Sequence, residues 1–283
     1  MKRTVQITLT AYEEKLLIAY GVSRSSTFIK AYENHKILFK GSTTVSALSQ
    51  IVTHTPLRIC GRMTRNGMKA NKNQSSAAHW LLYNRGVITN VDSCIEEVIK
   101  SFSINDLFIT GANAIDCFGN AALLIGSPCG GGYGKVIGAI YTEGFKTLIL
   151  ATSDKLIREN INELYDKVHR QDCDYSNGMA CGLAPIHGKI ITEIEAIKMI
   201  ADTDAYIFAH GGIDGAEGGC AIQIEGEESE ISKVLNIVDK IKKENILLGD
   251  SDSLEECEFP SYGCGQHLSC RYSKKNLIHQ EDE

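Results

Sequence analysis

The chain lacks the long apolar runs that membrane helices and secretory signals require. No segment reaches the roughly 18 uninterrupted apolar residues that cross a bilayer. Residues 1–10 alternate polar and apolar side chains, a pattern typical of a strand, and contain no apolar signal core. These absences favour a cytoplasmic protein with no membrane partner.

A continuous basic run is also missing. The formal net charge is −6, and charges of both signs are mixed along the chain. Without a basic run to meet phosphate backbones or acidic lipids, the composition argues against nucleic acid as a partner. A small molecule is the expected partner, and no cofactor is indicated.

None of the ten cysteines is in a Cys-x-x-Cys pair, the spacing typical of zinc sites. The cysteines are scattered through apparent strands and helices instead of framing a small loop-rich scaffold, which predicts reduced thiols in a reducing cytoplasm. Two loose groups leave a thiol-rich metal or iron–sulfur protein open as an alternative. The first is Cys173 with Cys181, and the second is Cys257, Cys264 and Cys270 with His267.

A length of 283 residues with 43% hydrophobic content suggests two domains. Apolar strands alternate with helical patterns through most of the chain, and this order predicts βαβ units around a parallel sheet. We therefore expect an α/β fold with a Rossmann-like core over residues 1–188. A smaller α+β domain over 189–248 and a cysteine-containing acidic tail over 249–283 complete the expected organisation.

Local patterns give more detailed expectations. Residues 229–243 have the apolar spacing of an amphipathic helix. Residues 57–60 are expected to form a strand, and 61–76 a polar surface loop. Residues 77–83 are expected to be helical, and Asp92 is placed to cap the helix that follows it.

Two glycine-rich segments are the most informative part of the sequence. Each has the pattern of an apolar strand that runs into an amide-rich turn and then a helix, which is where α/β proteins bind anions. The two segments therefore predict an anion-binding cleft. One runs Ile37-Leu38-Phe39-Lys40-Gly41-Ser42-Thr43-Thr44, and the other extends from Ile109 through Gly111-Ala112-Asn113 to Gly130-Gly131-Gly132 and Lys135.

The expected ligand-binding residues come from these turns. Ser42 and Thr43 offer hydroxyl and N–H groups at a helix N-terminus, although an N-cap role alone would explain Ser42. Lys40 or Lys135 could pair with the anion, and either could instead be a solvated lysine. Asn113 could bind a ligand hydroxyl or carbonyl, or could serve the turn. The predicted set is Lys40, Gly41, Ser42, Thr43, Gly111, Asn113, Gly130, Gly131, Gly132 and Lys135.

Three residues are candidate catalysts. Asp116 follows an expected strand, where a carboxylate can reach a ligand, but its neighbours also suit a turn. Cys129 precedes glycines whose amides could stabilise a thiolate nucleophile, or it is a small packed residue. Glu217 is in a glycine-rich loop over 211–219 that joins two expected strands. It could enter the cleft as an acid or base, and the loop could equally be only flexible.

The order of these motifs resembles the superfamily of ribose-5-phosphate isomerase, glucosamine-6-phosphate isomerase and coenzyme A transferase. Lys40-Gly41-Ser42-Thr43 is similar to its phosphate turn, and the segment from Thr110 to Asp116 is similar to its acidic segment after a strand. Gly130-Gly131-Gly132 and Ser153-Asp154-Lys155-Leu156 follow in the order of two further motifs. The resemblance spans about residues 36–157.

The resemblance implies a Rossmann-like fold, a small anionic metabolite such as a sugar phosphate, and a homo-oligomer. It does not imply ribose-5-phosphate isomerisation itself. Thr110, Asn113 and Ala114 stand where ribose-5-phosphate isomerase has acids. The catalytic glutamate of the isomerase also has no counterpart near Gly134. We therefore expect a protein that binds a metabolite. It could be an isomerase or transferase that catalyses a different reaction, or a sensor without catalytic activity.

Overall fold

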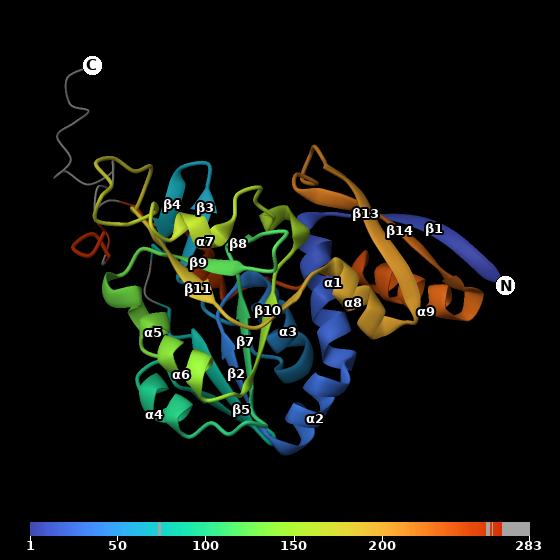
Figure 1. The fold of residues 1–283 in the computed structure, drawn as a ribbon, viewed down its shortest axis with the longest axis horizontal. Helices are drawn as coiled ribbons and strands as arrows, with labels where there is room; N and C mark the ends of the chain where they lie inside the picture. The colour runs from blue at the N-terminus through green and yellow to red at the C-terminus, as the bar shows by residue number, and fades with distance from the viewer. Residues whose placement is uncertain (73–74, 259–260, 262, 268–283) are drawn as a thin grey trace.

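A computed structural model describes residues 1–72, 75–258, 261 and 263–267 of the protein. The architecture is mixed α/β, with a six-stranded main sheet and a smaller three-stranded sheet beside it (Figure 1). Within the described ranges, no helix has the length and apolar character needed to cross a membrane.

The main sheet has the strand order β12-β10-β7-β2-β5-β6. Four neighbouring strands are parallel, and β5 and β6 complete the sheet as antiparallel strands. These four strands also follow one another in chain order. Because they are parallel, their carboxyl ends lie along one edge of the sheet. The strands are β2 (Lys36–Lys40), β5 (Trp80–Asn84), β6 (Val87–Asn90), β7 (Leu107–Gly111), β10 (Lys146–Leu150) and β12 (Lys189–Ile191).

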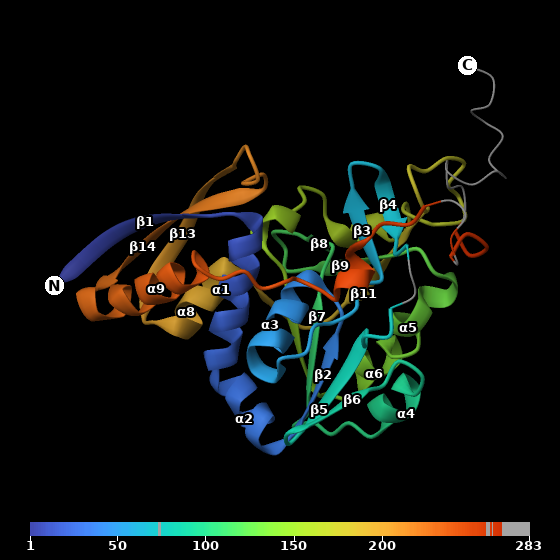
Figure 2. The same ribbon diagram turned by 180° about the vertical axis from the view of Figure 1, so that it is seen from behind.

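Helices cover both faces of the main sheet (Figures 1 and 2). On one face they share a buried core with Ile37 and Phe39 of β2, and on the other face they pack around Leu38 and Phe108. Successive residues of β2 therefore serve opposite layers. The first face carries α1 (Ala11–Arg24), α2 (Ser26–Asn34) and α3 (Thr43–Thr53), and the second carries α4 (Ile95–Lys100), α5 (Gly131–Gly134) and α6 (Ile137–Thr142).

The small sheet is antiparallel, with the strand order β1-β14-β13. β1 pairs with β14 along its whole length, from Lys2 opposite Glu227 to Leu9 opposite Cys220. The first strand of the chain therefore lies in the small sheet, far in sequence from its partner. The strands are β1 (Lys2–Leu9), β13 (Thr203–Gly211) and β14 (Gly219–Glu227).

Two helices, α8 (Glu193–Ile200) and α9 (Glu228–Ile241), pack against this sheet. The range of α9 confirms the amphipathic helix expected over 229–243. α1 contacts α3, α8 and α9, so it links the two units. Buried residues of β2, α1, α9 and β14 belong to one hydrophobic cluster, and the two sheets therefore share a continuous core.

Smaller elements lie beyond the carboxyl ends of the parallel strands (Figures 1 and 2). Part of the tail runs beside them, where the Cys257 N–H donates to the Ala70 carbonyl at 2.8 Å. These elements are the hairpin of β3 (Gly61–Thr64) and β4 (Gly67–Ala70), the sheet of β8 (Ala114–Ile115), β9 (Ala121–Ile125) and β11 (Gly182–Ile186), α7 (Ile161–Leu164), and the 3-10 turns Pro128–Gly130, Ser153–Lys155 and Ser251–Leu254.

Four local predictions are wrong. Residues 57–60 form no strand, since their N–H groups bind side chains and single carbonyls. Residues 61–76 contain the β3–β4 hairpin instead of a plain loop. Residues 77–83 are not helical, because β5 pairs with β2 and β6 on its two sides. Asp92 does not cap α4, since its carboxylate accepts backbone N–H groups at the start of β5.

Candidate functional site

Lys40, the last residue of β2, is a buried cation at the carboxyl edge of the main sheet. Only 7% of the residue is exposed, and its Nζ lies 6.0 Å from the centre of the Trp80 ring. Within the described residues, the ammonium makes neither a hydrogen bond nor an ion pair. Burial lowers the pKa of Lys40 to about 8, and nearby Cys60 offsets this only in part. A buried ammonium without an anion is unfavourable, so an anion beside it would be stabilising.

His79, within electrostatic reach of Lys40, is a neutral imidazole. Burial first, and then the charge of Lys40, lower the pKa of His79 to about 3. Its Nδ1 lies 3.0 Å from the carbonyl oxygen of Arg58. Because a carbonyl only accepts, Nδ1 carries the hydrogen and Nε2 is an acceptor. His79 therefore adds no second positive charge beside Lys40.

Arg58 is the other cation in this region, and it is already compensated. One guanidinium nitrogen lies 2.6 Å from a carboxylate oxygen of Asp92, and Nε donates to the Ala77 carbonyl at 3.0 Å. The same carboxylate accepts the N–H groups of His79 and Trp80. This network fixes the start of β5 and leaves Lys40 as the cation that lacks an anion.

The turn after Lys40 is shaped by close backbone contacts. The Gly41 N–H donates to the His79 carbonyl at 2.7 Å, and a Cβ on Gly41 would lie 2.3 Å from the Arg58 carbonyl oxygen. Glycine is therefore required at this position. Ser42 then caps α3, because its hydroxyl accepts the Val45 N–H at 3.2 Å. Thr43 begins the helix, whose first-turn N–H groups face the carboxyl edge.

The structure brings the two glycine-rich segments together. A Cβ on Gly111, at the end of β7, would lie 2.5 Å from the Ser42 hydroxyl. A Cβ on Gly132 would lie 2.8 Å from the Trp80 indole nitrogen. Trp80 therefore stands between Lys40 and the second glycine run. Of the predicted ligand-binding residues, Lys40, Gly41, Ser42, Thr43, Gly111 and Gly132 form this neighbourhood.

The other predicted binding residues have structural partners. Asn113 accepts the Leu124 N–H at 3.0 Å through its side-chain oxygen, which stabilises the β8–β9 pairing. Lys135 lies 3.4 Å from Glu96 on the exposed side of α4. Gly130 and Gly131 both have positive φ, at 79° and 56°, and shape the turn into α5.

The candidate catalysts are not brought into contact with Lys40. Asp116 accepts three backbone N–H groups and the side-chain amide of Asn120. Burial raises the pKa of Asp116, but these hydrogen bonds outweigh burial and leave the pKa below its ordinary value. Cys129 is exposed in a turn at φ 52°. Glu217 is exposed and accepts the Gly215 N–H at 3.0 Å.

The cysteine groups show no metal-binding arrangement within the part of the chain that the structure describes. The Cys173 thiol donates to the Tyr175 carbonyl at 3.0 Å, and the Cys181 thiol lies 3.7 Å from the Met179 carbonyl. Cys270 lies outside the described residues.

Sequence reasoning missed the charged groups at the ends of β10 and β12. Lys155 follows β10, and burial lowers its pKa to about 8. Glu193 follows β12 and is fully buried, as is Glu14 of α1. Glu14 has the same helical phase as Leu17 and Ile18, so a carboxyl group within an apolar stripe was the available signal.

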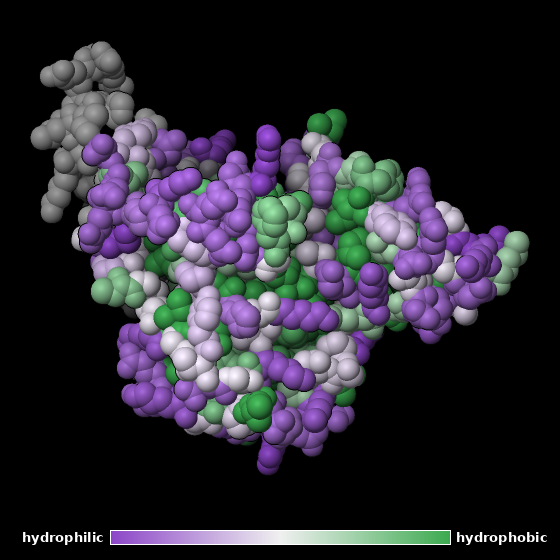
Figure 3. All heavy atoms as spheres, viewed as in Figure 1, coloured by the Kyte–Doolittle hydropathy of each residue, from purple (hydrophilic) through white to green (hydrophobic). Residues whose placement is uncertain are grey.

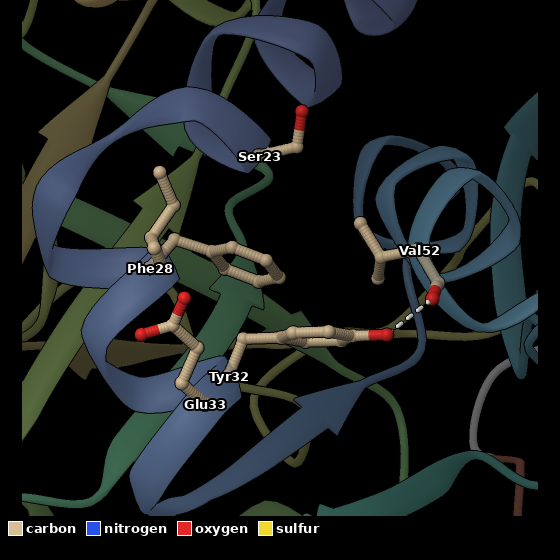
Figure 4. Close-up of a pocket in the computed structure, with 6 residues that line it drawn as sticks. Ser23, Phe28, Tyr32, Glu33 and Val52 are labelled. Atoms are coloured by element: carbon tan, nitrogen blue, oxygen red, sulfur yellow. Dashed lines mark hydrogen bonds between the residues drawn. The ribbon is translucent and has the colours of Figure 1, made fainter. Parts of the chain in front are cut away.

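A separate pocket of about 260 Å³ lies beside α2, which leads into the amino end of β2 (Figure 4). Its wall includes the Tyr32 ring, whose hydroxyl donates to the Val52 carbonyl at 2.9 Å. The pocket is therefore at the opposite end of β2 from Lys40. The lining residues are Ser23, Phe28, Ile29, Tyr32, Glu33 and Val52.

The face drawn in Figure 1 is mostly hydrophilic, and hydrophobic residues come to the surface toward its middle, over the region of β8, β9 and β10 (Figure 3).

Comparisons of the chain with protein-family models, curated proteins and solved structures found no match.

Proposed function

We propose that the protein binds a small anionic metabolite, such as a sugar phosphate, at the carboxyl edge of the main sheet. The anionic group lies against the Lys40 ammonium, at the end of β2 and beside the Gly41 turn. Ligands favour this edge of parallel α/β sheets because helix N-termini and diverging loops meet there. The order of strands and turns over residues 36–157 supports a Rossmann-like relationship to the isomerase and transferase superfamily.

The Lys40 ammonium is the observation that carries this proposal. Lys36, on the same strand, donates to the Ser101 carbonyl at 2.7 Å, and Lys135 pairs with Glu96. Lys40 lies over the Trp80 ring face, and it forms no ion pair with a carboxylate among the described residues. A bound anion would supply the missing opposite charge and raise the pKa of Lys40 toward its ordinary value. Because the charge is buried, that contact is stronger than one on the surface.

Binding is the activity that the geometry supports best, and turnover would be a further step. Asp116 is the one acid of the superfamily segment that this chain retains, and its hydrogen bonds hold a turn. An isomerase or transferase reaction at this edge would therefore depend on other groups. The superfamily resemblance also leads us to propose a homo-oligomer, which light scattering of the purified protein tests.

Isothermal titration calorimetry at pH 7 tests the binding proposal with inorganic phosphate, ribose 5-phosphate and coenzyme A. Wild type is compared with Lys40→Met and with Lys36→Met, a matched lysine change at the other end of β2. We expect at least one anion to bind wild type and Lys36→Met alike. Lys40→Met should bind it at least about 10-fold more weakly, the loss expected for a charge-assisted contact.

Two results would refute the proposal. One is the absence of binding by all three anions. The other is equal affinity of wild type and Lys40→Met for an anion that binds. Incubation of a bound sugar phosphate with wild type, followed by NMR of the sugar, then separates a sensor from an isomerase.

A further inference from the structure

Two fully buried carboxyl groups meet where the small sheet joins the main one. Glu14 belongs to α1, and Glu193 is the first residue of α8; both are 0% exposed. The two helices pack closely, since a Cβ on Gly21 of α1 would lie 2.7 Å from Ala196 of α8. The pair is therefore closed off from water while these helices stay packed.

The two carboxyl groups have different partners. The Ser153 N–H donates to the two oxygens of Glu193 at 3.1 and 3.2 Å. Both oxygens of Glu14 are buried and accept no hydrogen bond from the described residues. The groups that face Glu14 are the Glu193 carboxyl and the thiol of Cys220 on β14, which is only a weak donor.

Two lysines lie within electrostatic reach of the pair but form no salt bridge with it among the described residues. The Lys15 ammonium donates to the Ala11 carbonyl at 2.7 Å, and neither Lys15 nor Lys155 forms an ion pair with Glu14 or Glu193 among the described residues. Asp154 adds a further negative charge. Two carboxylates in contact inside a protein cannot both stay ionised without a cation.

We propose that Glu14 and Glu193 share one proton at neutral pH and act as a carboxyl latch, which holds α1 against α8 and β14 and opens when alkaline pH removes the proton. The protonated carboxyl donates to the ionised one, which gives Glu14 a hydrogen bond that its buried oxygens otherwise lack among the described residues. Removal of the proton leaves two adjacent negative charges, which repel each other and favour water. The inference does not depend on the proposed ligand.

The pKa shifts agree with this geometry. Burial first, and then the charge of Glu193, raise the pKa of Glu14 to about 8. Burial also raises the pKa of Glu193, while the Ser153 N–H favours its charged form. Glu14 is therefore the protonated member. Burial lowers the pKa of Lys155 to about 8, so alkaline pH also removes a positive charge that faces the pair.

Cys220 provides a direct readout of latch opening. It is 4% exposed behind Glu14, whereas Cys181 is 9% exposed near β11, away from the pair. Wild type is alkylated with iodoacetamide between pH 6.5 and 9, and the modification of each cysteine is followed by peptide mass spectrometry. Each rate is divided by the rate in urea-unfolded protein at the same pH, which removes the intrinsic effect of pH on the thiol.

We expect the protection of Cys220 to fall at least about 10-fold between pH 6.5 and 9, since one pKa unit corresponds to a tenfold change in an equilibrium. Cys181 should change less than about 2-fold. Glu14→Gln keeps a donor for Glu193 and cannot ionise, so its Cys220 protection should change with pH much less than that of wild type. Glu97→Gln, the same change on an exposed part of α4, should behave as wild type.

Three outcomes would overturn the inference. They are a pH-independent Cys220 in wild type, an equal loss of protection at both cysteines, and a Glu14→Gln protein that keeps the wild-type pH step. If Glu14→Gln failed to fold, the selectivity between the two cysteines in wild type would still decide the question. Anion titration does not enter this test, so it can fail while the binding proposal stands.

Discussion

Lys40 and the carboxyl latch are two solutions to the burial of charge. Lys40 is a cation with an aromatic ring beside it and no anion. Glu14 and Glu193 are two acids in contact that need only a shared proton. We propose that an anion from outside the protein completes the first arrangement, and that a shared proton completes the second within the protein. Burial of a charged group therefore does not by itself indicate a binding site. The indication comes from the kind of partner that the buried group lacks.

The two regions should also respond to pH in opposite directions. The pKa of Glu14 is raised, so the folded state binds more protons than the unfolded state between pH 4.5 and about 8, and stability falls as pH rises through this range. The pKa of Lys40 is lowered, so the unfolded state binds more protons between about pH 8 and 10.5, and stability rises there.

The largest expected effect comes from Glu14→Gln, which removes one side of this contrast. Because the pKa of Glu14 is raised from 4.5 to about 8, the unfolding free energy of wild type should fall by roughly 4 kcal/mol as pH rises from 5 to 8.5. Glu14→Gln should not show this fall. Urea unfolding followed by circular dichroism at both pH values measures the difference. Glu97→Gln should lose stability with rising pH as wild type does. If both variants became equally more stable than wild type at pH 8.5, Glu14 would not be the group responsible.

Lys40→Met tests the other side of the contrast. A pKa lowered from 10.5 to about 8 corresponds to about 3 kcal/mol that wild type loses at pH 7 by burying the charge, so the variant should be more stable by about that amount. The gap should close as pH rises from 8 to 10.5, where wild type becomes neutral. Unfolding curves at pH 7 and 10.5 decide this, and a variant that is less stable at pH 7 would show that Lys40 has an internal partner.

Local sequence patterns anticipated much of the fold, and long-range pairing explains what they missed. The α9 helix follows from apolar residues at helical spacing, because that face packs on the small sheet. The apolar run Trp80-Leu81-Leu82-Tyr83 fits a strand or a buried helix equally well, and only its pairing with β2 decides between them. The partner of β1 lies more than 200 residues away, so no local signal could identify it.

The site follows the same division. Lys40 and Ser42 could be placed from sequence, because a strand that runs into a glycine turn puts them at a carboxyl edge. The sequence could not show that Lys40 matters more than Lys135. That difference depends on the burial of Lys40 and on the ion pair between Lys135 and Glu96. Glu14 was visible as a charge in the apolar stripe of α1, but its contact with Glu193 depends on how α1 and α8 pack.

Gly21→Ala should loosen the latch without changing a charge. An added Cβ would lie 2.7 Å from both the backbone and the side chain of Ala196, so the helices must shift, at a cost of about 2 kcal/mol. Gly138→Ala in α6 meets nothing within 4 Å and should stabilise slightly. Alkylation at pH 7 should find Cys220 less protected in Gly21→Ala alone, and an unchanged Cys220 would separate helix packing from latch closure.

The smallest effect is expected at Lys135, the exposed counterpart of Lys40. Its side chain is 54% exposed and lies 3.4 Å from Glu96, so water screens the pair. Lys135→Met should change the unfolding free energy by less than about 0.5 kcal/mol, because surface substitutions of this kind rarely exceed that amount. Anion affinity should also stay within about 2-fold of wild type in calorimetry at pH 7. A large loss of affinity would place the anion at the α5 end of the second glycine run and would show that the buried lysine is not its main contact.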